Sequence, residues 1–106
     1  MQGKRIQMGL WAAGLCATVA FMPAQAADVA AGKAKAEESC VDCHGDDGRG
    51  DDENADIVEL STKEFVTALE DYQKGVRTKH AKMARAAKKL SATDVANLAA
   101  YYETLD

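Results

Sequence analysis

The feature that most constrains this chain is a short motif that holds two cysteines and a histidine. Cys40 and Cys43 stand three positions apart, and His44 follows the second cysteine directly. Cys-x-x-Cys-His is the attachment pattern for c-type haem. On one helical turn each thiol can add to one haem vinyl group, and the adjoining histidine lies within reach of the iron. The motif therefore predicts one covalent haem c held by Cys40 and Cys43, with His44 as an iron ligand.

The rest of the chain supplies little of a conventional hydrophobic core. Beyond residue 26 its aromatic side chains are Phe65, Tyr72, Tyr101 and Tyr102, and alanine makes up much of the apolar content. Domains of this size are marginal without a metal, a disulfide or a cofactor. A length of 106 residues excludes a multidomain enzyme, and 17 acids against 13 bases disfavour nucleic-acid binding through overall positive charge. The composition favours one small domain built around the haem.

The N-terminal segment is predicted to be a signal peptide. Two basic residues precede a mostly apolar stretch over 6–22, and Ala24-Gln25-Ala26 gives the small-x-small pattern that signal peptidase accepts. We expect residues 1–26 to be removed after Ala26, which leaves a haem domain at 27–106. Haem attachment of this type takes place outside the cytoplasm, so the leader and the motif both predict a periplasmic protein. The alternative is that the apolar stretch is retained as an N-terminal anchor.

Two other interpretations use the same cysteines. Cys40, Cys43, His44 and His80 could form a tetrahedral zinc site, but Cys43 and His44 are adjacent, which makes simultaneous coordination awkward. A thioredoxin-like dithiol would require the motif at a strand-to-helix junction, and no strand is predicted here. The haem interpretation is therefore preferred to both.

Hydrophobic spacing and capping signals predict an all-α fold. Phe65, Leu69 and Tyr72 recur at helical spacing, and Ser61 with Glu64 forms a capping box. The expected elements are a helix from Asp28 to about Val41, an irregular loop over 45–59, a helix that starts at the Ser61 box and stops at Gly75, a short basic helix over 81–89, and a last helix opened by Ser91-Ala92-Thr93-Asp94.

Three segments of the chain share the pattern of a known family: Cys40-Val41-Asp42-Cys43-His44-Gly45, the segment from Phe65 to Arg77 and the tail from Met83 to Tyr102. Together they resemble the short bacterial class I cytochromes c. They are similar to the single-haem domains of two-haem cytochromes c and to the cytochrome subunit of flavocytochrome c sulfide dehydrogenases. The resemblance covers essentially all of Asp28 to Leu105. It implies a cytochrome c domain at 27–106, with about four helices around a covalently attached haem.

The resemblance also implies the second iron ligand. Relatives place a methionine about seven residues before the start of the final helix, and Met83 stands there. A thioether opposite His44 favours ferrous iron, raises the reduction potential and closes the sixth position to substrates. His80 is the alternative ligand, three residues earlier, and would lower the potential. Lys79 and Lys82 are more distant competitors, expected to matter only at high pH.

Two packing details follow from the same resemblance. The first and last helices are expected to cross beside the haem, with Gly32 against Tyr101 or Tyr102. Relatives carry a proline whose carbonyl accepts the proton of the proximal histidine, and Asp56 is expected to occupy its place. Either the backbone carbonyl or the carboxylate at that position could then accept from His44.

Charge is distributed unevenly along the chain. Residues 37–64 hold eleven acids against Arg49 and Lys63, whereas residues 74–89 hold seven bases and no acid. Such runs are often only solvated faces. A dipole of this kind can also orient electron-transfer partners, which would make electron-transfer rates sensitive to salt.

The sequence predicts an electron-transfer protein that is not an enzyme in its own right, because no nucleophile–base pair or open metal site is evident. The preferred function is a soluble periplasmic carrier that docks in turn with a redox protein donor and acceptor. The alternative is a tightly bound cytochrome subunit of a dehydrogenase complex, such as a flavoprotein sulfide dehydrogenase. A haem sensor with an open sixth site is a weaker third option.

Overall fold

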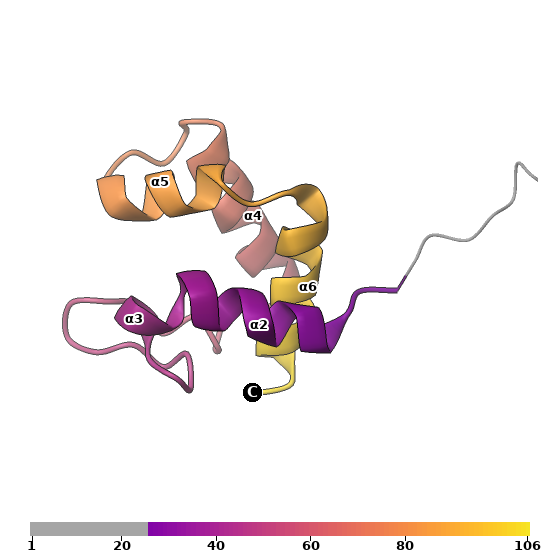
Figure 1. The fold of residues 1–106 in the computed structure, drawn as a ribbon. Helices are drawn as coiled ribbons and strands as arrows, with labels where there is room; N and C mark the ends of the chain where they lie inside the picture. The colour runs from indigo at the N-terminus through magenta and orange to yellow at the C-terminus, as the bar shows by residue number, and fades with distance from the viewer. Residues whose placement is uncertain (1–25) are drawn as a thin grey trace, which may run out of the picture.

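The computed structural model describes residues 26–106, so the predicted signal peptide, apart from Ala26, lies outside the described residues. Within 26–106 the chain is helical and has no strand, which confirms the predicted all-α class. The helices are α2 (Val29–Ser39), α3 (Val41–His44), α4 (Thr62–Gln73), α5 (Ala81–Lys88) and α6 (Ala92–Glu103) (Figure 1). Among these residues no helix has the length and apolar character needed to cross a membrane.

The first expected helix is divided into two. α2 begins where the Asp28 carboxylate accepts the Ala31 N–H at 3.0 Å and so caps the helix. It ends at Ser39 rather than about Val41, because Cys40 has left helical geometry, with φ −117°. The haem motif then forms a separate turn, α3, which stops at Gly45, where φ is +86°. Glycine adopts this left-handed region without steric cost, so the chain can reverse directly after the motif.

α2 and α6 cross in close contact, as the resemblance implied (Figure 1). At the crossing a Cβ added to Gly32 would overlap the backbone carbonyl of Asn97 and would lie 2.9 Å from Cβ of Tyr101. The aromatic partner of Gly32 is therefore Tyr101, not Tyr102. The Asn97 side chain forms a second contact between α6 and the start of α2, since its Oδ1 accepts the Asp28 N–H at 2.8 Å.

Two capping boxes fix where α4 and α6 begin. The Ser61 hydroxyl accepts the Glu64 N–H at 3.1 Å, and the Glu64 carboxylate accepts the Ser61 N–H at 2.9 Å. Ser91 and Asp94 repeat this pattern, with both distances at 3.0 Å. Each box satisfies two backbone donors that a helix start would otherwise leave unpaired.

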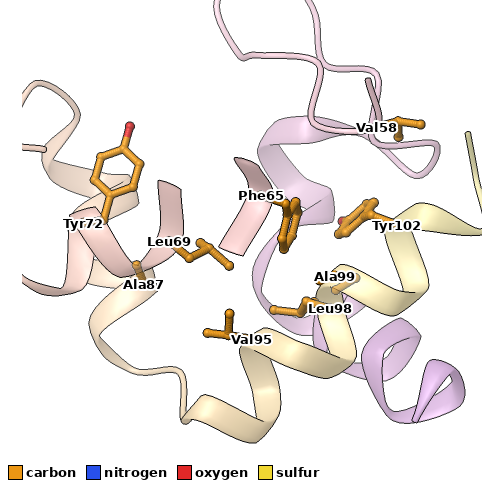
Figure 2. Packing of buried hydrophobic residues seen from close by; sticks show 10 residues of the cluster. Val58, Phe65, Leu69, Tyr72, Ala87, Val95, Leu98, Ala99 and Tyr102 are labelled. Carbon is orange, nitrogen blue, oxygen red and sulfur yellow. The ribbon is translucent and has the colours of Figure 1, made fainter. Parts of the chain in front are cut away.

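The hydrophobic core is small and lies where α4 meets α6. Figure 2 shows Phe65 of α4 beside Tyr102 of α6, and their ring centroids are 5.5 Å apart. Leu98 is fully buried, and Val58 of the preceding loop is 2 % exposed. The remaining buried hydrophobic residues are Ala36, Leu69, Tyr72, Ala87, Val95 and Ala99. The described chain thus buries few large side chains, in agreement with the expectation that a cofactor completes the core.

Candidate functional site

A large open cavity lies beside this core. Its volume is about 540 Å³, within the range of ~300–1,000 Å³ typical of ligand sites. A neighbouring cavity of about 440 Å³ shares part of its lining, including His44, Ala55, Tyr72 and Met83. The apolar lining of the larger cavity comes mainly from the loop, α4 and the segment after α5: Ile57, Leu60, Phe65, Leu69 and Leu90.

The two cysteines of the motif reach these cavities from α3 and the residue before it. Cys40 is half-buried and lines the larger cavity, whereas Cys43 is exposed and lines the smaller one. The two sulfurs are not joined to each other in a disulfide. Burial raises the pKa of the Cys40 thiol, which keeps that sulfur in its neutral form.

Tyr102 lies close to the Cys40 thiol and is a residue that sequence reasoning gave only a packing role. Its hydroxyl is buried and has no hydrogen-bond partner among the described residues. Burial, and then the neighbouring Cys40, raise the pKa of Tyr102 well above its ordinary value, so the phenol stays protonated. A buried phenol therefore stands next to one of the predicted attachment sulfurs.

The ring of His44 is oriented by the loop that follows it. His44 Nδ1 lies 2.8 Å from the carbonyl oxygen of Ala55. A carbonyl only accepts, so Nδ1 carries a proton and donates, which leaves Nε2 as the ring nitrogen that can act as a ligand. This is the arrangement in which histidine binds metals, with its other nitrogen held by a backbone carbonyl.

The acceptor is one residue earlier than the position expected from the resemblance. Asp56 accepts the N–H groups of Val58 and Glu59 through its carboxylate, at 2.9 and 3.3 Å. It also lies 3.7 Å from the Arg49 guanidinium. Aspartate commonly caps its own following turn in this way. The Asp56 carboxylate therefore accepts hydrogen bonds from its own loop, and the Ala55 carbonyl is the group that accepts from His44.

The loop reaches this position through backbone contacts. Gly50 N–H donates to the His44 carbonyl at 2.7 Å, and Ile57 N–H donates to the Gly48 carbonyl at 2.9 Å. Gly48 has φ +74°, and a Cβ there would lie 2.7 Å from Val58 and 2.8 Å from Tyr102. These contacts fold the loop back onto α3, and so bring the Ala55 carbonyl to the histidine.

Met83 lies within α5, and His80 is the residue directly before that helix. Met83 is half-buried and lines both cavities, each of which His44 also lines. His80 is the exposed N-cap residue of α5 and borders only the smaller cavity, with Lys79 and Lys82. The larger cavity is thus shared by Cys40, His44 and Met83, whereas His80 stands at the edge of the smaller one.

Gln73 holds α5 in place and was not identified from the sequence. Its side-chain amide donates to the carbonyls of Ala87 and Leu90, at 2.9 and 3.0 Å. These bonds connect the end of α4 to the end of α5 and to the residue before the N-cap of α6. Since they span 14 and 17 residues, no local pattern indicates them.

The residues present fit a haem. Two cysteine sulfurs, one imidazole, one thioether and apolar walls meet at adjoining cavities, and Lys63 and Arg77 are among the charged side chains that line the larger one, with Asp56 and Glu64. The zinc alternative receives no support, because residues 26–106 contain no group of three or more His, Cys, Asp or Glu side chains able to hold a metal ion. The dithiol alternative lacks its strand-to-helix junction in the same part of the chain.

Comparison with known families agrees with this site. A family model described as cytochrome c oxidase, cbb3-type, subunit III matches residues 27–101, which include the motif and all five described helices except the end of α6. No curated protein matched the chain. Because the match covers most of the sequence, it implies haem c with iron and electron transfer rather than catalysis by this chain. The chain therefore belongs to the cytochrome c family described as cytochrome c oxidase, cbb3-type, subunit III.

Proposed function

We propose that residues 27–106 form a periplasmic electron carrier with one haem, bound covalently through Cys40 and Cys43 and ligated by His44 and Met83. The observation that supports it best is that these four side chains line two adjoining cavities: His44 and Met83 line both, Cys40 lines the larger one and Cys43 the smaller one. When bound, haem c supplies an iron that alternates between the ferric and ferrous states.

The protein's own groups tune and protect that iron. The Ala55 carbonyl, 2.8 Å from His44 Nδ1, fixes the ring and makes it a stronger donor. Met83 would supply the second ligand to the iron, which would let the site exchange electrons without binding a substrate. The apolar side chains of Phe65 and Leu69 limit water, which lowers the local dielectric constant and helps to set the potential.

The ligand assignment is tested by optical spectroscopy of the purified holoprotein. Sulfur ligation gives the ferric form a weak absorption band at the red end of the visible spectrum. We expect Met83→Ala to abolish this band and His80→Ala to retain it. The reverse result would assign the position to His80. A protein mass that equals the bare peptide, with two free thiols, would refute covalent haem altogether.

Export is tested separately. The leader pattern and the extracytoplasmic site of haem attachment support cleavage after Ala26. N-terminal sequencing of the periplasmic fraction should therefore start at Ala27. A haem-containing species that sediments with membranes and retains residues 1–26 would instead indicate an anchor.

A second candidate is a cytochrome subunit of a larger complex. The family description itself names an oxidase subunit, which favours this class. The dehydrogenase subunit suggested by the resemblance, with a flavoprotein partner, belongs to the same class. Gel filtration of protein from the native host separates the candidates: a small free species supports the carrier, and co-elution with an oxidase or a flavoprotein supports the subunit.

A further inference from the structure

The hydroxyl of Tyr102 is the one buried side-chain polar atom within residues 26–106 that has no hydrogen-bond partner. The residue is 3 % exposed, so bulk water does not reach this group. An unpaired buried hydroxyl has lost its hydrogen bonds to water and gained nothing in return, which makes it costly and rare in native proteins. The position of this hydroxyl therefore needs a physical reason.

The ring of Tyr102 is fixed by packing on several sides. Its centroid is 5.5 Å from that of Phe65, which lies beside it in Figure 2, and 5.1 Å from that of Tyr101. From the loop, Gly48 approaches so closely that an added Cβ would lie 2.8 Å from the ring and 2.7 Å from Val58. The side chain cannot swing out to reach water, so the partner of its hydroxyl has to be a group beside it.

The polar group beside the hydroxyl is the sulfur of Cys40. Apart from burial, Cys40 is the main cause that raises the pKa of Tyr102, and Tyr102 in turn acts to lower the pKa of Cys40. Both directions are those of a phenol that donates to sulfur, because such a bond favours a neutral phenol and a charged sulfur. Cys40 is itself held by its backbone, since its N–H donates to the Ala36 carbonyl at 2.8 Å and its carbonyl accepts the His44 N–H at 3.0 Å.

The chemistry of attachment decides which of the two groups donates. When a thiol adds to a vinyl group, the sulfur bonds to one vinyl carbon and the hydrogen goes to the other, so no oxidant or reductant is consumed. A thiol can donate or accept a weak hydrogen bond, whereas a thioether sulfur can only accept. Once Cys40 has formed its thioether, a hydrogen bond between the pair requires the Tyr102 hydroxyl as donor. Exposed Cys43 can meet water instead.

We infer that Tyr102 is a positioning residue for the haem, because its hydroxyl donates a hydrogen bond to the Cys40 sulfur and so fixes one of the two attachment points; this rests on the proposed covalent haem. The bond also draws electron density from the sulfur at the porphyrin edge. Hydrogen bonding around a haem is one of the ways in which a protein sets its potential, and a donated bond favours the more electron-rich ferrous state. Tyr102 thus raises the reduction potential.

The first test removes the hydroxyl and keeps the ring. In the Tyr102→Phe holoprotein we expect a lower midpoint of urea unfolding and a lower reduction potential in a redox titration. If the hydroxyl had no partner in the holoprotein, its removal would raise the unfolding midpoint, because nothing would be left unsatisfied. Tyr101→Phe is the matched control, since it deletes the same atom from the half-buried neighbour in α6, and it should leave both values unchanged.

A double-mutant cycle shows whether the effect acts through the sulfur. The Cys40→Ala holoprotein is attached through Cys43 alone and has no sulfur beside the Tyr102 hydroxyl. In this background Tyr102→Phe should lower neither the reduction potential nor the unfolding midpoint. An equal fall of both values in the two backgrounds would show that Tyr102 acts by packing, and would overturn the inference.

Proton NMR of the ferrous holoprotein, whose low-spin iron is diamagnetic, tests the same bond without a variant of Cys40. We expect a slowly exchanging hydroxyl proton with cross-peaks to the Cys40 β-protons, absent from Tyr102→Phe. A Tyr102 hydroxyl proton with cross-peaks to another acceptor would refute the assignment. The proposed function fails separately: a parent protein without covalent haem contradicts that proposal, whereas a parent with covalent haem and no coupling between Tyr102 and Cys40 refutes the role of Tyr102 alone.

Discussion

At the scale of single residues, the sequence indicates the groups that carry the chemistry but not the groups that orient them. Cys40, Cys43 and His44 form a local pattern whose chemistry is readable without a fold. The partner of His44 is a backbone carbonyl, which every residue possesses, so its identity depends on the path of the loop. That path placed Ala55, rather than Asp56, at 2.8 Å from the ring.

This assignment makes Asp56→Asn a nearly silent change. An asparagine oxygen can still accept the Val58 and Glu59 N–H groups, and only the exposed contact with Arg49 is lost, which is worth about 0–1 kcal/mol. We expect the free energy of unfolding in urea to stay within about 1 kcal/mol of the parent value. A much larger loss would mean that the Asp56 carboxylate has a further partner in the fold besides its own loop and Arg49.

Gly32 gives a second prediction at this scale. In a free helix Gly→Ala stabilises by about 0.5–1 kcal/mol, but here the new Cβ would overlap the Asn97 carbonyl. We therefore expect Gly32→Ala to destabilise the holoprotein by about 1–3 kcal/mol in urea unfolding. Ala34→Gly, on the exposed side of α2, is the control that measures the effect of helix propensity alone on the free energy of unfolding. A gain in stability for Gly32→Ala would show that α2 and α6 do not meet as closely as described.

At the scale of helices, local signals predicted most boundaries. The Ser61 capping box and the start of α6 at Ser91 stand where the sequence placed them, and Asp28 caps α2. The break at Cys40 was not predicted, because the spacing of small and apolar residues continues through it. The hydrogen bonds from Gln73 to the end of α5 were also not predicted, since they depend on how α4 and α5 pack.

Gln73 should control how firmly α5 presents Met83. Gln73→Leu leaves the Ala87 and Leu90 carbonyls without their side-chain donor, at a cost of about 1–3 kcal/mol. Beyond that loss, we expect the red absorption band of Met83 ligation to disappear at lower temperature than in the parent. The neighbouring exposed substitution Lys74→Leu is the control. An unchanged band with reduced stability would mean that Gln73 supports the fold without positioning the ligand.

The capping boxes also predict how the helices respond to acid. Bonds from the Ser61 and Ser91 N–H groups lower the pKa of Glu64 and Asp94, from 4.5 and 3.8 respectively. When folding lowers the pKa of a carboxyl group, the folded state gains stability at pH values above the pKa of the unfolded state. This stability is lost as the pH falls through the pKa of the folded state. Stability should thus decline below about pH 4. Asp94→Asn should flatten the decline; an equally steep acid dependence in this variant would exclude the α6 cap as a source.

At the scale of the whole molecule, the fold has a small core on one side and a large apolar cavity on the other. α6 packs against α2 and α4, and α5 packs mainly against α4 (Figure 1). The sequence predicted this need for a cofactor from its shortage of aromatic residues. It could not predict the cavity's shape, which results from long-range packing of the loop, α4 and α5.

The dependence of the fold on its haem is the prediction that follows at this scale. Cys40→Ser/Cys43→Ser cannot form either thioether, and the chain would then leave partly buried Ile57, Leu60 and Leu90 lining an unfilled cavity of about 540 Å³. Since a domain of this size has little stability to spare, we expect this variant to lose its cooperative urea transition and much of its helical circular dichroism at 25 °C. Cys43→Ser alone, which keeps the sulfur at half-buried Cys40, should be intermediate. If the double variant, free of haem, unfolded at the same urea concentration as the holoprotein, the apolar residues would be sufficient by themselves, and the cavity would not be the missing half of the core.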